Sequence, residues 1–246
     1  MARIKYVFYS EDGPYGTMYR VDNHGTDGDD AIYGGSGNAL IKGRGGDDWI
    51  DAGCGDDRVF GGAGDDIIIH DGGVGRLFGG AGNDDIMGYG DGTYVKGGIG
   101  DDTIAGSDGR FEGNKGDDQF SFNLWQDGNN VVANGGGGRD AFSVFVNIQG
   151  ADYTQYGPSS AKIEDFQVGV DKLELDSHLT NQSIHITRAT TFDTLDTDDN
   201  HFLNDADAAT WLGDVVATAT GIDIFVGLSR IELVGVAQLA ATDFVL

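Results

Sequence analysis

Three similar nonapeptides decide the fold of this chain: GGAGDDIII at residues 61–69, GGAGNDDIM at 79–87 and GGIGDDTIA at 97–105. The pattern continues in blocks of nine that begin at residues 25, 34, 43, 52, 61, 70, 79, 88 and 97. A block two residues short follows from 106, and full blocks return at 113 and 135, with a degenerate one around 125–133 between them. A fixed short period is the signature of a repeat architecture, in which neighbouring repeats bury one continuous core.

The eighth position of every block is apolar. These residues are Ile32, Ile41, Ile50, Val59, Ile68, Leu77, Ile86, Val95, Ile104, Phe111, Phe120, Val132 and Phe142. Because side chains alternate across a strand, we expect position 8 to point inward and positions 7 and 9 outward. The six preceding positions are rich in Gly and Asp, which is typical of tight turns. The sequence therefore predicts an all-β chain built on a right-handed parallel β-roll, with two blocks per coil.

The turns of alternate blocks stack on opposite edges of such a roll, and the two edges differ in charge. Turns of the odd blocks carry Asp at position 6: Asp30, Asp48, Asp66, Asp84, Asp102, Asp118 and Asp140. Stacked strands lie about 4.8 Å apart, so carboxylates of successive turns can share a cation. Carboxylates and turn carbonyls form the all-oxygen shell that calcium prefers, which predicts about four to six calcium ions in this row.

The turns of the even blocks carry no such row. Their position 6 reads Ala39, Asp57, Gly75 and Thr93, then has no clear equivalent in the short block, and then reads Asn130. Since Asp57 has no acidic neighbour one coil away, we expect no strong metal site on this edge.

The block resembles a known motif: residues 25–143 are similar to the RTX, or haemolysin-type, calcium-binding repeat GGxGxDxUx. The resemblance implies a parallel β-roll with calcium as its bound ion. The alternative is a Gly-rich roll without metal, in which seven carboxylates in file would repel one another.

Composition changes after Ser143, with 34 Gly in residues 25–143 and seven in 144–246. The segment IEDFQVGVDKLEL (163–175) and the C-terminal residues 235–246 resemble those of RTX proteins exported by type I secretion machinery. This implies a secreted protein in three parts: an N-terminal cap (1–24), the roll (25–143) and a β-rich C-terminal cap with the export signal (144–246). An ordinary strand that closes the roll is compatible with the same residues.

A second candidate metal site lies in residues 196–207, which fit an EF-hand loop at five of its positions. Its ligands would be Asp196, Asp198, Asn200, the carbonyl of Phe202, and Asp207. Two departures are His201 at the usual turn glycine and the short closing Asp207. The alternative interpretation is an acidic turn between two short helices.

Composition excludes several functional classes. The chain has 246 residues with 41 acids, 36 of them Asp, against 15 Lys and Arg, for a net charge of −26. So acidic a chain does not suit nucleic acid as a partner. No apolar run reaches the length of a membrane span, the N-terminus lacks the apolar core of a secretory signal, and the lone Cys54 excludes an intrachain disulfide framework. No zinc-protease, nucleophile-elbow or phosphate-loop motif occurs, so we expect no enzymatic activity.

The outward strand positions differ between the two sheets. Basic and aromatic residues gather on the even one: Lys42, Arg58, Phe60, Arg76, Phe78, Tyr94 and Lys96. This stripe suggests binding of an anionic polysaccharide; alternatively, its cations only offset the acidic edge. The odd sheet carries Trp49, Ile67, Ile69 and Met87, which we expect to be covered by a terminal segment or by another molecule, including a second copy.

The first 24 residues predict a hairpin of strands at 3–9 and 17–21 about the turn DGPYG at 12–16. A repeat stack needs a dissimilar end, so we expect a cap, with a partner-binding arm as the alternative. Together the patterns predict a secreted calcium-binding protein that folds on extracellular calcium, as a structural or adhesive component of a bacterial surface or matrix. A polysaccharide-binding module is the alternative function.

Overall fold

The computed structural model describes residues 3–5, 21–125, 128–149, 159–181, 184–190, 202–203, 215–217, 221–226, 229–236 and 239–240. These residues form strands, turns and bends and include no helix, which confirms the all-β prediction. Accordingly, no helix in this part of the chain is long and apolar enough to cross a membrane. The chain divides into two compact units, Met1–Asp118 and Gln119–Leu246, which are described separately.

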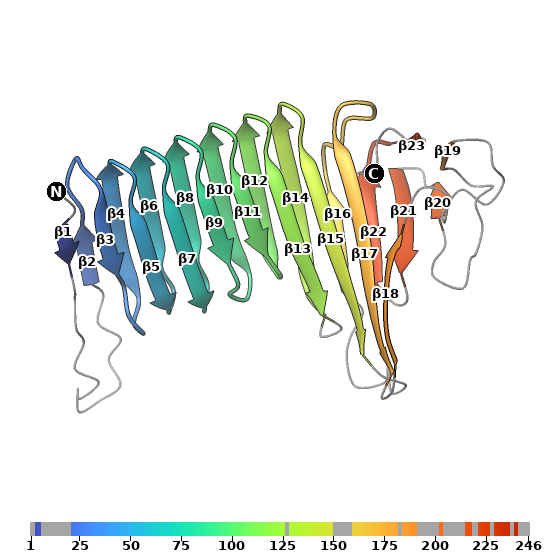
Figure 1. The fold of residues 1–246 in the computed structure, drawn as a ribbon, viewed down its shortest axis with the longest axis horizontal. Coiled ribbons are helices and arrows are strands. Elements are labelled where there is room, and N and C mark those ends of the chain that lie inside the picture. The colour runs from blue at the N-terminus through green and yellow to red at the C-terminus, as the bar shows by residue number, and fades with distance from the viewer. Residues whose placement is uncertain are drawn as a thin grey trace. The chain divides into compact units, whose positions relative to one another are not determined.

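The first unit is a flattened roll of two parallel sheets whose strands alternate along the chain (Figure 1). The odd sheet contains β1 (Arg3–Lys5), β3 (Asp30–Tyr33), β5 (Trp49–Cys54), β7 (Ile67–Gly72), β9 (Asp85–Gly88) and β11 (Thr103–Gly106). The even sheet contains β2 (Val21–His24), β4 (Ala39–Gly45), β6 (Arg58–Ala63), β8 (Arg76–Ala81), β10 (Thr93–Ile99) and β12 (Gly109–Lys115).

The strand register follows the repeat. Ile50 pairs with Ile68 and Ile68 with Ile86 in the odd sheet, so each coil adds 18 residues. The position-8 side chains of this unit, from Ile32 to Phe111, are each at most 1% exposed. Burying a side chain of this size stabilises the fold by roughly 1.5–3 kcal/mol. The predicted parallel β-roll, with position 8 as its core, is therefore confirmed.

The strands are longer than the three residues of positions 7–9. β6 and β8 continue through positions 1–3 of the following blocks, where Gly62 pairs with Gly80 and Ala63 with Ala81. Alternation across a strand that points position 8 inward and position 9 outward also points position 1 inward. Position 1 is therefore buried in the roll, a consequence that becomes important at both edges.

The N-terminal strands differ from the predicted hairpin. β1 pairs in parallel with β3, and β2 pairs in parallel with β4, so each extends a different sheet. Both sheets end in an open edge that can accept one more parallel strand, and these strands occupy the two edges instead of pairing with each other. The rest of the predicted hairpin, residues 6–20, lies outside the described residues.

The second unit contains parallel and antiparallel pairs. One sheet has the order β13 (Gln119–Trp125), β15 (Ala141–Gln149), β17 (Lys172–Asn181) and β18 (Ile184–Thr190). The other has the order β14 (Asn130–Gly137), β16 (Ser160–Ile163), β22 (Ser229–Val234), β21 (Gly221–Val226) and β20 (Val215–Ala217). Two short strands, β19 (Phe202–Leu203) and β23 (Leu239–Ala240), pair with each other. Pairing is parallel as far as β17 and β22 and antiparallel from there to β18, β21 and β20.

The degenerate block corrects one predicted core residue. Val131 and Ala133 are buried in β14, whereas Val132, the predicted position-8 residue, faces outward. A change of one residue in the length of the preceding loop moves every side chain of a strand to the other face, so the nine-residue count fails here. Parallel pairing also runs past residue 143, because β15 pairs with β17 over its whole length.

Candidate metal centre

A ladder of aspartates runs along one edge of the first unit. We call this the odd edge, where turns lead into odd-numbered strands. The backbone N–H of Asp30 donates to Oδ1 of Asp48 at 2.8 Å, and the N–H of Asp48 donates to Oδ1 of Asp66 at 2.8 Å. The same bond, at 2.9 Å, joins Asp66 to Asp84, Asp84 to Asp102, and Asp102 to Asp118. The structure thus brings the six predicted ligands of this unit into one buried row.

The second carboxylate oxygen of the inner aspartates has no donor among the residues that the structure describes. Among the described residues, Oδ2 of Asp48, Asp66, Asp84 and Asp102 is buried and accepts no hydrogen bond. At the end of the row, Oδ2 of Asp30 accepts hydrogen bonds from the N–H and hydroxyl of Thr26. Burying a carboxylate oxygen without a hydrogen-bond partner costs free energy. Each of the four inner Oδ2 atoms therefore needs a proton or a cation beside it.

Burial changes the acidity of the row. It raises the pKa of Asp48 to about 6, and those of Asp66 and Asp84 to about 7, from an ordinary value of 3.8. Burial likewise raises the pKa of Asp102 to about 6 and that of Asp118 to about 7. The hydrogen bond from the preceding coil lowers each pKa, and neighbouring carboxylates raise it. These all-oxygen donors, buried and short of positive charge, fit a hard divalent cation such as calcium.

The glycine at position 1 leaves the space that these carboxylates occupy. A Cβ on Gly61 would lie 2.3 Å from Oδ2 of Asp66, and one on Gly79 would lie 2.2 Å from Oδ2 of Asp84. Position 4 is glycine for a different reason, since Gly64 has a φ of 125° in the turn, which other residues rarely adopt. The odd blocks thus use glycine at position 1 for space and at position 4 for backbone conformation.

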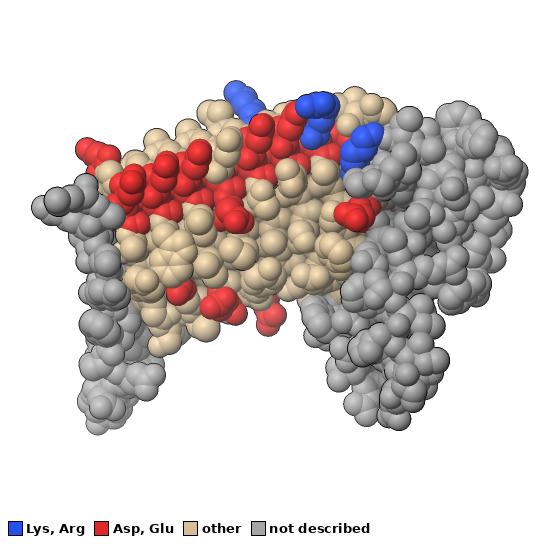
Figure 2. Space-filling model, viewed as in Figure 1, with Lys and Arg blue, Asp and Glu red and all other residues tan. Residues whose placement is uncertain are grey.

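A second row on the same edge was missed by the sequence analysis. Position 5 also carries side-chain oxygens: Asp29, Asp47, Asp65, Asn83, Asp101 and Asp117. Each of the first five accepts the backbone N–H of position 5 in the next coil, at 2.7–3.1 Å. Most of this row is exposed, and Figure 2 shows acidic side chains in a band along the odd edge. The sequence signal for this row is the Asp or Asn that precedes the position-6 Asp in the GDD and GND motifs.

The second unit contains a shorter ladder of the same kind. The predicted ligand Asp140 is buried, and its N–H donates to Oδ1 of Asp171 at 3.0 Å. Oδ2 of Asp171 accepts the N–H of Gln167 at 2.7 Å, so both of its oxygens are used within the protein. Asp171 was not predicted, although GVDKLE at 169–174 matches the last six positions of the repeat.

The other predicted metal positions have different outcomes. At the even edge, where turns lead into even-numbered strands, the described turns of the first unit place no acids one coil apart at position 6. Asp57 is buried there, with Oδ1 accepting the N–H of Ala39 at 2.7 Å. In the loop 196–207, Asp196, Asp198, Asn200 and Asp207 lie outside the described residues, and Phe202 begins β19. The EF-hand-like site stays a prediction.

Four residues of the basic and aromatic stripe contact one another. Phe60 and Phe78 stack at 4.9 Å, and Tyr94 contacts Phe78 edge-on at 5.9 Å. The guanidinium of Arg58 lies 5.0 Å from the Phe60 ring centre. The ring faces of Phe60 and Phe78 are therefore turned toward each other. Polysaccharide binding stays a prediction.

The outward side of the odd sheet carries aromatic and aliphatic side chains, as expected. Tyr33 and Trp49 meet edge-to-face at 5.0 Å, and Ile67 is 38% exposed. Self-assembly through this sheet stays a prediction.

The chain has little sequence similarity to known proteins. No family model matches the sequence, and no curated protein matches it. Among solved structures, the chain is similar to the crystal structure of extracellular lipase LipA from Serratia marcescens, at 17% identity and a TM-score of 0.27. The match covers 97% of this chain and 40% of that one.

Proposed function

We propose that this is a secreted calcium-binding protein of the RTX type, which folds when it meets extracellular calcium. The observation that carries the proposal is the row of buried aspartates at the odd edge, in which Oδ2 of Asp48, Asp66, Asp84 and Asp102 accepts no hydrogen bond among the described residues. Six aspartates of the first unit, Asp30, Asp48, Asp66, Asp84, Asp102 and Asp118, would hold the ions together with turn carbonyls, and Asp140 would act in the second unit.

The chain's own groups explain why folding would depend on the metal. Oδ1 of each aspartate ties one coil to the coil before it, which holds the carboxylates in file. The glycine at position 1 leaves the space that Oδ2 itself occupies. When bound, calcium supplies the positive charge that this row lacks. Without it, mutual repulsion and desolvation of the row oppose folding, so metal binding and folding are coupled.

Export and biological role rest on sequence features. The resemblance of residues 163–175 and 235–246 to type I secretion substrates supports export of an unfolded chain from a cytosol low in calcium. The apolar outward side chains of the odd sheet, including Trp49 and Ile67, support a structural or adhesive role through self-association outside the cell.

A calcium titration followed by far-UV circular dichroism tests the proposal. In excess chelator we expect little β structure, because the bare carboxylates oppose coil stacking. Added calcium should restore a β spectrum in a cooperative transition. Magnesium is the control, since its small octahedral shell suits these turns poorly and should leave the chain unfolded at the same concentration. A complete β spectrum in excess chelator would contradict the proposal.

A further inference from the structure

One block of the roll departs from the repeat pattern at two positions that contact each other. Block 70–78 reads HDGGVGRLF, with His70 at position 1, where the other complete blocks have glycine or, once, Ala52. The same block has Gly75 at position 6, where the odd edge has aspartate. Position 1 points inward, and the imidazole of His70 is accordingly 0% exposed inside the even edge.

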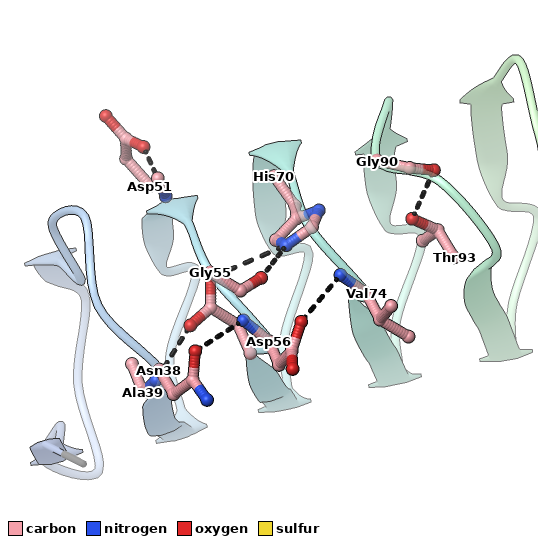
Figure 3. A network of polar contacts seen from close by, with 11 residues as sticks. Asn38, Ala39, Asp51, Gly55, Asp56, His70, Val74, Gly90 and Thr93 are labelled. Carbon is pink, nitrogen blue, oxygen red and sulfur yellow. Dashed lines mark hydrogen bonds and ion pairs between the residues drawn. The ribbon is translucent and has the colours of Figure 1, made fainter. Parts of the chain in front are cut away.

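The imidazole faces acceptors of the turn one coil earlier (Figure 3). Its Nε2 lies 3.0 Å from the carbonyl oxygen of Gly55 and 3.5 Å from Oδ2 of Asp57, a side chain that is itself fully buried. Because both neighbours accept hydrogen bonds, Nε2 carries a proton and donates it to the carbonyl. His70 therefore presents a donor to a carboxylate oxygen that accepts no hydrogen bond within the described structure.

The ring also occupies the space of its own block's position-6 side chain. A Cβ on Gly75 would lie 2.9 Å from Nδ1 and Cε1 of His70. The same two positions face each other elsewhere, since a Cβ on Gly61 would lie 2.3 Å from Asp66 and one on Gly88 would lie 2.9 Å from Cγ2 of Thr93. In an odd block this space holds the carboxylate that we assign to calcium.

The ring reaches the next coil as well. A Cβ on Gly90, in the following even turn, would lie 2.9 Å from Cε1 of His70. One side chain thus packs against three successive turns of the even edge. The register between β5 and β7 shifts on both sides of Gly53, the residue that pairs with His70.

We propose that His70 takes the place of a calcium ion at the even edge, joining the turn that contains Asp57 to its own turn with a protein donor instead of a metal. The inference rests on the proposed calcium function of the odd edge. It gives the roll one link between coils that forms without calcium, and it explains why position 6 of this block has no carboxylate.

The exchange variant His70→Gly/Gly75→Asp tests the inference by restoring the glycine and aspartate of the odd blocks. The carboxylate introduced at position 75 would then lie one coil from that of Asp57, and we expect one additional calcium ion per chain by equilibrium dialysis. The matched control is His70→Gly, which removes the ring without adding a carboxylate and should leave the calcium count unchanged. A folded exchange variant with the wild-type count would overturn the inference.

A second arm decides the question if the exchange variant does not fold. We expect His70→Ala to lower the melting temperature in saturating calcium by roughly 5 °C, with the calcium count unchanged. His70→Gln, whose amide can still donate, should recover part of this loss. A lower calcium count in His70→Ala would show that His70 belongs to a metal site and would overturn the inference. If the wild type binds no calcium, the proposed function fails by itself, whatever the stability of the His70 variants.

Discussion

Replacement of Asp66 and Asp84 together by alanine should raise the calcium concentration at the folding midpoint by about tenfold or more. These two carboxylates are neighbours in the middle of the row, so their loss removes ligands from three successive gaps between coils. The transition should also become less cooperative, because the row is divided into two shorter ones. Far-UV circular dichroism at increasing calcium concentration measures both changes.

The matched control is Asp65→Ala/Asp101→Ala. It removes the same number of charges from the same edge, but at the exposed position 5, where each Oδ1 accepts one backbone N–H of the next coil. We expect a midpoint shift of less than about threefold, since no buried ligand is lost. Equal shifts in the two double variants would mean that general acidity, not the buried row, determines the calcium response.

Acidification should stabilise the calcium-free protein. Burial raises the pKa values of Asp48, Asp66 and Asp84 to about 6–7 in the folded state, from 3.8 when the chain is unfolded. Between these values the folded state binds more protons than the unfolded state, so the free energy of unfolding falls as pH rises. The stabilisation is fully present below the unfolded pKa and is lost as pH rises through the folded pKa.

Far-UV circular dichroism of calcium-stripped protein in metal-free buffers, from about pH 4.5 to pH 8, tests this dependence. We expect little β signal near pH 8, as in excess chelator, and an increasing β signal toward the acidic end of this range. In saturating calcium, where the chain is folded, the melting temperature should instead fall on acidification, because protons compete with the metal for the same oxygens. The calcium-free β signal of the Asp66→Ala/Asp84→Ala variant should depend less on pH. A β signal of stripped wild type that increases with pH would contradict this prediction.

The repeat made much of the first unit predictable from sequence. The recurring apolar residue at position 8 predicts which side of each strand is buried, and in the first unit all of the predicted residues face the core. The row at position 6 followed from the same count, because a constant 18-residue step places equivalent residues in register.

Counting in blocks of nine gives wrong or incomplete predictions where the chain departs from this period. In the degenerate block, a loop of different length moved the core residue from Val132 to Val131. At the N-terminus, β1 and β2 each pair with the open edge of a different sheet. Local signals for a hairpin do not indicate this pairing with distant strands. Asp171 lies 31 residues from Asp140, so no constant step led to it, although its local motif was present.

The role of His70 depended on a contact that periodicity alone does not show. From the sequence alone, a histidine at a glycine position can be interpreted as a tolerated substitution. Its role depends on the structural finding that position 1 faces position 6 of the same block. Only the register of neighbouring coils then places its Nε2 beside Gly55 and Asp57.

Anomalous scattering from crystals of the full chain grown in calcium tests the central claim most directly, because it locates each ion. We expect a row of about four to six peaks at the odd edge, beside Oδ2 of Asp48, Asp66, Asp84 and Asp102, and none beside His70. Peaks confined to the exposed position-5 row, or an odd edge without peaks in a folded roll, would contradict the central claim.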